Sequence, residues 1–276
     1  MNLPNLPKIP KRESDSHKGT YGRLLFIGGS RGMAGSISLS AMAALRSGAG
    51  LVTVAVPDSI VDTVSSFDPC YMTIPLREQP DGSIGRHAQQ QLEVVLGQFD
   101  CIGVGPGLRN NTETQALVAW INQTCQTPVV FDADALNAIS SLSDVVFPFP
   151  RVLTPHPGEF KRLRKTESAS PELANEFAAA MQAVVVLKGH QTCVTDGMSS
   201  FVNTTGNPGM ATGGSGDVLT GVICAMIGQR LSLFDAARLG VYVHGLAGDK
   251  AAESLGQISV TAADIANHLH EAFKSL

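Results

Sequence analysis

Short apolar runs rich in β-branched residues recur along this chain, and they constrain its fold more than any other feature. A strand that is apolar at every position, with no alternation, is buried on both faces, as in a parallel sheet covered by helices. Segments of helical composition separate the runs, at 36–47, 112–124 and 171–182. This alternation predicts an α/β fold with a central, mostly parallel β-sheet flanked by α-helices on both faces. We expect its strands at 24–27, 51–56, 102–104, 129–131, 152–153 and 184–187.

The last third of the chain changes character, because helix-like stretches follow one another at 218–229, 235–254 and 261–274. The last of them opens with Thr261-x-x-Asp264, a helix-start signature. The Pro- and Gly-rich segment 75–85 resembles a surface loop rather than a domain linker. A chain of 276 residues with 43% hydrophobic residues can bury a full core as one unit. We expect an N-terminal extension over 1–18 and a single domain over 19–276.

Charge and composition limit the partners. The formal net charge is -4 and no long Lys/Arg run occurs, which argues against a nucleic-acid partner. The first residues lack the apolar core of a signal peptide, and no stretch of about eighteen apolar residues follows, so we expect no membrane partner and a cytoplasmic protein. The histidines and the five cysteines lack metal-ligand spacing, and the cysteines are predicted to be reduced and structural, with Cys101 and Cys193 inside strand-like runs.

A glycine-dense loop, 207–217, indicates chemistry. Glycines let backbone N–H groups approach an anion closely, and the start of a helix favours negative charge, so Gly213, Gly214, Ser215 and Gly216 suit a phosphate cradle. Phosphate would repel a carboxylate there, and the simplest role for Asp217 is to take a proton from a hydroxyl that attacks phosphorus. The alternative is an ordinary turn in which the aspartate caps a helix.

The ends of the predicted strands carry further polar loops. Ligands bind at the carboxyl ends of parallel strands, and glycine- or carboxylate-bearing segments follow four of the runs directly. Each segment alone is also compatible with a structural turn, and Lys188 with a surface lysine whose charge reaches solvent. Together they predict a site on one rim of the sheet. The segments are 28–36, 105–108, 132–137 and 154–159, with 188–192 after a fifth run.

These motifs, in this order, resemble the ADP-dependent NAD(P)H-hydrate dehydratase family of the ribokinase-like superfamily. The resemblance runs from about residue 19 to the C-terminus, whereas Gly-x-Gly-Asp alone would indicate only a ribokinase-like protein. The motifs that carry it are Gly-Pro-Gly-Leu at 105–108, Asp-Ala-Asp-Ala-Leu-Asn at 132–137, Leu-Thr-Pro-His-Pro-Gly-Glu at 153–159, Val-Leu-Lys-Gly at 186–189, Gly-Asn-Pro-Gly at 206–209 and Gly-Gly-Ser-Gly-Asp-Val-Leu-Thr-Gly at 213–221.

The resemblance implies a repair reaction. The S forms of hydrated NADH and NADPH (NADHX and NADPHX) would be dehydrated to NADH and NADPH, with ADP as co-substrate converted to AMP and phosphate, and with Mg²⁺ as cofactor. A ring hydroxyl leaves poorly and its phosphate ester leaves readily. Asp217 would therefore deprotonate that hydroxyl as catalytic base, while the amides of 213–216 hold the transferring phosphoryl group.

The resemblance also implies binding roles for named residues. Asn137 and Glu159 lie where ribokinase-like enzymes organise Mg²⁺ and its waters. Alternatives stay open: His156 also fits a turn histidine between two prolines, and Asp132 and Asp134 also fit pairing with backbone at a strand end. Ser36 stands where the family commonly has alanine. The predicted contacts with the hydrate are Ser36, Gly107, His156 and Asp217, and those with ADP or AMP are Lys188, Gly189, His190, Gln191, Thr192 and Gly216.

Partners follow from the same resemblance. An epimerase that interconverts the R and S hydrates, which some relatives carry fused, is expected in a separate protein, because 1–18 is too short for a domain. A homo-oligomer, specifically a tetramer, is expected. Two rivals remain open: a small-molecule kinase of the superfamily acting on a vitamin precursor or sugar, and a catalytically silent nucleotide sensor. A lasting phosphorylated product would indicate the kinase, and binding without turnover would indicate the sensor.

Overall fold

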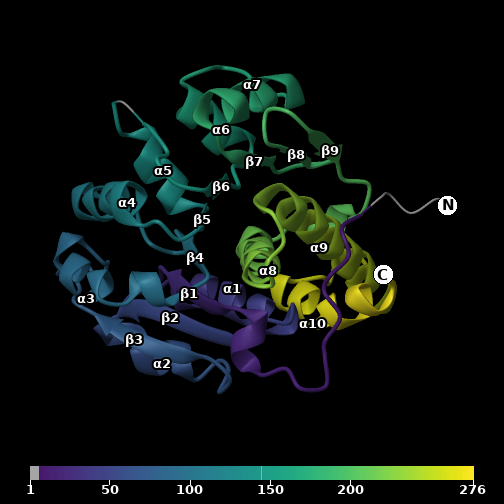
Figure 1. Cartoon of the computed structure of the whole chain (residues 1–276), viewed down its shortest axis with the longest axis horizontal. Coiled ribbons are helices and arrows are strands. Elements are labelled where there is room, and N and C mark those ends of the chain that lie inside the picture. The colour runs from purple at the N-terminus through teal and green to yellow at the C-terminus, as the bar shows by residue number, and fades with distance from the viewer. Residues whose placement is uncertain (1–5, 144) are drawn as a thin grey trace.

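The computed structural model describes residues 6–143 and 145–276, and a curved sheet forms its centre (Figure 1). The strand order is β3-β2-β1-β4-β5-β6-β7-β8-β9. Neighbours from β3 to β7 pair in parallel, and β8 and β9 continue the sheet antiparallel. This confirms the predicted mostly parallel α/β fold. The strands are β1 (Arg23–Ile27), β2 (Leu51–Pro57), β3 (Met72–Leu76), β4 (Cys101–Val104), β5 (Val129–Phe131), β6 (Arg151–Leu153), β7 (Val184–Leu187), β8 (Cys193–Thr195) and β9 (Ser200–Val202).

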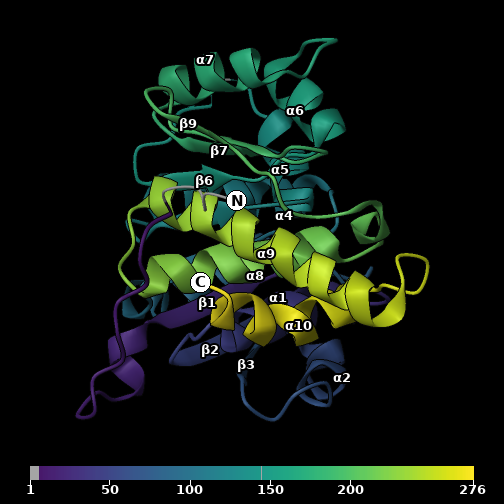
Figure 2. The ribbon, with the colours of Figure 1, turned by 90° about the vertical axis from the view of Figure 1, so that its right-hand side faces the viewer.

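Helices cover both faces of the sheet (Figures 1 and 2), because strands apolar at every position need a cover on each side. One face carries α1 (Ala34–Arg46), α2 (Val61–Ser65), α8 (Ser215–Gly228), α9 (Leu233–Leu255) and α10 (Ala262–Lys274). The other carries α3 (Gln89–Glu93), α4 (Thr112–Thr124), α5 (Asp134–Ser140), α6 (Pro157–Arg164) and α7 (Pro171–Met181). Short 3₁₀ turns complete the fold: η1 (Lys18–Tyr21), η2 (Asp58–Ile60), η3 (Arg86–Ala88), η4 (Leu96–Gln98) and η5 (Pro208–Met210).

Helix α8 lies at the centre of its layer, packed against α1 and α9, and every residue from Val218 to Gly228 is buried. It begins at Ser215, earlier than the expected start at residue 218, because Gly214 adopts a left-handed φ of 91° and forms the N-cap. Asp217 therefore lies inside the first turn of the helix rather than before it. The predicted capping box at Thr261 and Asp264 is confirmed at the start of α10.

All six predicted strands are present, β8 corresponds to the strand-like run around Cys193, and the edge strands β3 and β9 were not expected. The expected loop at 75–85 is wrong at its start, because Pro75 and Leu76 belong to β3. Proline is tolerated there since β3 lies at the edge of the sheet. Cys101 and Cys193 lie in strands as predicted, and among the described residues the five cysteines are unpaired.

The expected boundary at residue 18 stays a prediction. Residues 1–5 of the expected extension lie outside the described residues, and Leu6 and Ile9 pack against the core of the α8 face. Within the part of the chain that the structure describes, no helix has both the length and the apolar character that crossing a membrane requires.

Candidate functional site

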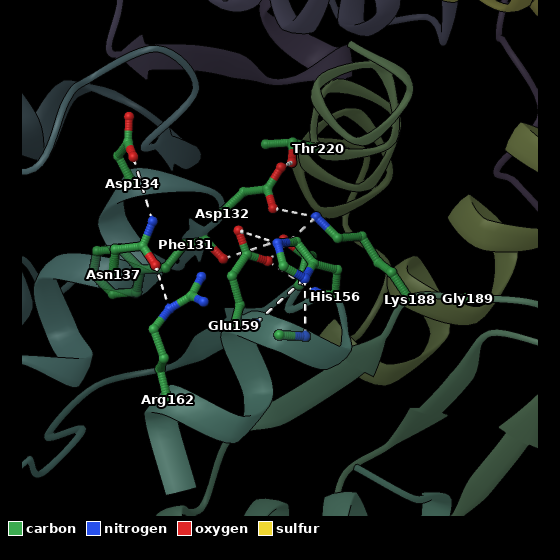
Figure 3. A network of polar contacts seen from close by, with 12 residues as sticks. Phe131, Asp132, Asp134, Asn137, His156, Glu159, Arg162, Lys188, Gly189 and Thr220 are labelled. Carbon is green, nitrogen blue, oxygen red and sulfur yellow. Dashed lines mark hydrogen bonds and ion pairs between the residues drawn. The ribbon is translucent and has the colours of Figure 1, made fainter. Parts of the chain in front are cut away.

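The carboxyl ends of β1, β4, β5, β6 and β7 lie along one edge of the sheet, because these neighbouring strands run parallel. Asp132 directly follows β5, Lys188 directly follows β7, and Glu159 lies in the first turn of α6, after β6 (Figure 3). The topology thus brings together polar segments that are far apart in the sequence.

A buried network of side chains joins these strand ends (Figure 3). The Lys188 Nζ atom lies 2.6 Å from Asp132 Oδ1 and 3.9 Å from Glu159 Oε2. The Thr220 hydroxyl, on α8, donates to the second oxygen of Asp132 at 2.7 Å. Asp132 is only 1% exposed, so its charge depends on these two partners. Of the alternatives left open, backbone pairing holds for Asp134, which accepts from the Arg109 N–H at 2.8 Å, and not for Asp132.

Asp217 faces this network from the first turn of α8. Burial, and next the negative charge of Asp132, raise the pKa of its carboxyl to about 7, while a hydrogen bond from the Ser36 side chain and the charge of Lys188 act against the rise. The Ser40 hydroxyl holds the backbone by donating to the Asp217 carbonyl at 2.8 Å. A carboxylate with a pKa near neutrality suits general base catalysis.

The glycine loop ends against the same cluster. A Cβ built on Gly216 would lie 3.2 Å from the Lys188 Nζ atom, so glycine lets the ammonium lie close to the start of α8. The first N–H groups of a helix have no carbonyl partner within the helix, and its N-terminus carries partial positive charge. The loop, the helix start and the ammonium of Lys188 together form a place suited to a phosphate group.

Two of the predicted hydrate contacts, Ser36 and Gly107, are neighbours. A Cβ built on Gly107, whose φ is 67°, would lie 2.8 Å from the Met33 carbonyl oxygen and 3.2 Å from Ser36 Cβ. Only glycine lets this loop approach the start of α1 so closely. The structure thus brings Ser36 and Gly107 together next to Asp217.

The predicted nucleotide segment 188–192 forms the turn between β7 and β8. The Lys188 N–H donates to the Pro155 carbonyl at 2.8 Å, which ties the turn to the end of β6. The Thr192 hydroxyl donates to the Gly189 carbonyl at 2.9 Å and closes the turn, leaving Gly189, His190 and Gln191 exposed. Lys188 therefore points into the cluster from a turn whose tip is open to solvent.

His156 and Glu159 form a capping box at the start of α6. The Nδ1 atom of His156 accepts from the N–H groups of Gly158 and Glu159 at 3.0 and 3.3 Å, and Glu159 Oε2 accepts from the His156 N–H at 2.8 Å. Burial and the charge of Lys188 lower the pKa of His156, which favours the neutral ring that this cap requires. Burial raises the pKa of Glu159. The structural alternative for His156 is therefore present, and its contact with a ligand stays a prediction.

Asn137 lies beside the cluster rather than in it. Its Oδ1 accepts from Arg162 Nε at 3.0 Å, and its Nδ2 donates to Asp134 Oδ1 at 3.4 Å. Across 6–143 and 145–276, no group of three or more His, Cys, Asp or Glu side chains is placed to hold a metal ion.

Two polar residues of α9 hold the glycine loop and were not predicted from the sequence. Asp249 accepts from the Gly206 N–H and from Asn207 Nδ2, both at 2.9 Å. His244 Nε2 lies 3.4 Å from the Ser215 hydroxyl, and burial lowers the pKa of His244 to about 4. The available signal was a histidine and an aspartate within the largely apolar stretch 239–249.

Comparisons with known proteins show the family of this chain. The NAD(P)H-hydrate dehydratase family model matches residues 24–271. A bifunctional NAD(P)H-hydrate repair enzyme of Moorella thermoacetica is 44% identical over 98% of this chain, and the corresponding Escherichia coli enzyme is 35% identical over 93%. The match covers 52% and 48% of those proteins, so the chain spans about half the length of the curated relatives it matches.

Solved structures show the same fold. An ADP/ATP-dependent NAD(P)H-hydrate dehydratase from Bacillus subtilis, co-crystallised with ATP and Mg²⁺, superposes with a TM-score of 0.80 at 28% identity, covering 96% of this chain and 94% of that one. A ribokinase-like protein from Enterococcus faecalis gives 0.86 at 30% identity, covering 97% and 92%. The matched range of the family model spans nearly the whole sheet. The chain belongs to the NAD(P)H-hydrate dehydratase family.

Proposed function

We propose that this protein dehydrates the S forms of NADHX and NADPHX to NADH and NADPH, with ADP as phosphoryl donor and AMP and phosphate as products. One observation carries the proposal: Asp217, whose pKa is about 7, lies in the first turn of α8, at the junction of the glycine loop and Lys188. A base and an anion-binding helix start then face the same reacting group.

The reaction proceeds in two steps. Asp217 takes the proton of the ring hydroxyl while that oxygen bonds to the β-phosphorus of ADP, and the bond to AMP breaks. Phosphate then leaves the ester with the electrons of the carbon–oxygen bond, assisted by the lone pair of the ring nitrogen. Loss of a proton from the adjacent carbon restores the double bond. The net change is hydrate and ADP to NAD(P)H, AMP and phosphate.

Binding roles follow the positions of the residues. Lys188, Gly189, His190, Gln191, Thr192 and Gly216 contact ADP and AMP, and the amides of Gly213, Gly214, Ser215 and Gly216 hold the transferred phosphoryl group. Ser36, Gly107, His156 and Asp217 contact the hydrate. The closeness of Ser36 to Gly107, and its hydrogen bond with Asp217, support one shared binding surface.

Magnesium fits the donor set through water. Glu159 and Asn137 offer oxygens of the kind Mg²⁺ prefers. The Asn137 oxygen already accepts a hydrogen bond from Arg162, and the Glu159 carboxylate takes part in the capping box of α6. Mg²⁺ keeps several waters and binds few protein groups besides phosphate oxygens, so both side chains would meet its waters. When bound, the ion neutralises charge on the transferring phosphoryl group.

We further propose a homotetramer located in the cytoplasm. Only the S hydrate would be consumed directly, so the R form would depend on a separate epimerase. Size-exclusion chromatography with light scattering tests the assembly, since a monomer would exclude it.

The test of the function uses chemically prepared NADH hydrate shown to contain the S form. With Mg²⁺ and ADP, the near-ultraviolet absorbance of the reduced nicotinamide ring should rise, and AMP and phosphate should appear in equal amounts. ATP in place of ADP measures donor strictness. No rise with either nucleotide contradicts the proposal, and a persistent phosphorylated alcohol from a hydroxymethyl substrate indicates the kinase.

A further inference from the structure

We propose that Asp132 is a positioning residue, which holds the ammonium of Lys188 at the first turn of α8 so that this cation meets the phosphoryl group. The inference rests on the proposed function of the site, and it gives a role to a buried carboxylate that the reaction itself does not use.

The two oxygens of Asp132 are bound by different elements. Oδ1 bonds Lys188 at the end of β7, and Oδ2 bonds Thr220 of α8. Thr220 lies one turn after Gly216 on the same helix face, and Gly216 is the residue whose missing side chain makes room for the ammonium. Asp132 thus fixes the position of Lys188 relative to α8, the helix whose first turn forms part of the proposed phosphate site.

Three carboxylates compete for Lys188. Asp132 is in contact at 2.6 Å, Glu159 lies at 3.9 Å, and the charge of Asp217 also acts on the ammonium. A lysine released by Asp132 would be drawn to the other two, and pairing with Asp217 would occupy the base. Asp132 therefore keeps the cation and the base apart.

Asp132 also acts on Asp217 through its charge. The groups that act on Asp217 are Asp132 after β5, Lys188 after β7, Asp134 on α5 and the Ser36 hydroxyl on α1. Of these, the charge of Asp132 raises the pKa of Asp217. Replacing Asp132 by asparagine removes that charge. The acid limb of the pH–rate profile should then move to lower pH while the plateau rate falls, a pair of changes that a purely structural role does not produce.

The central variant is Asp132→Asn. We expect kcat to fall about a hundredfold, as when a charge-positioning group of an active site is removed. Lys188→Met should cause a loss of similar size. At the plateau of the pH profile the double variant should be no slower than Lys188→Met alone, because Asp132 acts on the plateau rate through that lysine. Thr220→Val keeps the Asp132 carboxylate and removes one of its hydrogen bonds, so kcat should fall about tenfold or less. This variant replaces Asp132→Asn if that variant does not fold.

Asp100→Asn is the matched control. Asp100 accepts from the Arg23 N–H at 2.8 Å and pairs with Arg230 at 3.0 Å, but it precedes β4 at the opposite edge of the sheet. The kcat and the pH–rate profile of Asp100→Asn should equal those of the wild type.

Wild-type activity is measured first, which separates the two proposals. An inactive wild type contradicts the proposed function, and calorimetric titration with ADP then still tests Asp132: both single variants should weaken binding about tenfold, and the double variant no further. Wild-type kcat and an unmoved pH profile in folded Asp132→Asn, or fully additive losses in the double variant, overturn the inference.

Discussion

At the scale of single residues, the environment of Asp217 sets the pKa of its carboxyl and, through that pKa, affects the stability of the fold. Burial raises its folded pKa to about 7 from an ordinary value of 3.8. A carboxyl with a raised folded pKa stabilises the fold at pH values below its unfolded pKa, and this contribution is lost as pH rises through the folded pKa. The same shift that makes the group a base near neutral pH therefore reduces stability as pH rises from about 4, and the loss is complete above pH of about 7.

Asp217→Asn should separate these two effects. Turnover should be abolished and ADP affinity largely kept, because the amide preserves shape but accepts no proton. The melting temperature should exceed that of the wild type at alkaline pH and match it in acid, with a gain of about 1–2 kcal/mol once solvent screening is allowed for. Near-normal turnover would refute the assigned role, and equal melting at all pH values would refute the linkage.

Ser36→Ala should raise the pKa of Asp217 further. The Ser36 hydroxyl stabilises the ionised carboxylate by a hydrogen bond, and alanine removes it without crowding the site. The acid limb of kcat/KM should move to higher pH while ADP binding stays unchanged. An unmoved limb would show that this hydroxyl does not tune the base.

At the scale of elements, α9 is the support on which the glycine loop rests. Asp249 and His244 hold its two ends, and glycines between them let the loop lie directly on the helix. A Cβ on Gly245 would lie 2.3 Å from the hydroxyl oxygen of Thr205, just before the loop, and a Cβ on Gly248 would lie 2.2 Å from the sulfur of Met210 within it. The position of the loop is therefore set by the closeness of helix and backbone.

Gly245→Ala should displace this support. We expect a loss of about 1–3 kcal/mol in unfolding free energy, typical of overpacking, together with a raised KM for ADP. Gly97→Ala is the control, because a Cβ there meets no described atom within 4 Å. Denaturant unfolding and steady-state kinetics on both variants check this, and unchanged values in Gly245→Ala would contradict it.

The sequence predicts elements best where they are buried on both sides. The continuous apolarity of β4, β5 and β7 is a local property, and all three were found where expected. Edge strands β3 and β9 have mixed or exposed positions, so only their pairing with a neighbour identifies them.

The site divides in the same way. Gly216, Asp217 and Lys188 are visible through their local motifs. The bond from Thr220 to Asp132 joins residues 88 positions apart, and no local pattern predicts it.

At the scale of the whole molecule, one end of the parallel strands carries the candidate site and the other carries a buried arginine that supports stability. The carboxyl ends carry the site, and the opposite end carries Arg151, which is fully buried. Its guanidinium donates to the Asn122 and Cys125 carbonyls at 2.8 and 2.7 Å, and to Asn122 Oδ1 at 3.2 Å. Burial lowers the pKa of Arg151 to about 10. Its hydrogen-bond acceptors are carbonyl oxygens rather than a carboxylate.

Arg151→Met should therefore affect stability and not catalysis. Removing the donors leaves several buried carbonyls unpaired, and we expect a loss of about 3 kcal/mol or more in unfolding free energy. At a temperature where the variant is folded, kcat should equal that of the wild type. A reduced kcat in the folded variant would show that the two ends are coupled.

The late position of α8 in the chain has a consequence for synthesis on the ribosome. All nine described strands precede residue 203, whereas the glycine loop, Asp217 and Thr220 come after it. Domains fold as their chain emerges, so a nascent chain ending before residue 215 has its sheet residues but neither base nor cradle. Until α8 packs against α1, Asp132 and Lys188 lack the helix that covers them. The chain should therefore bind nucleotide only after the core is complete.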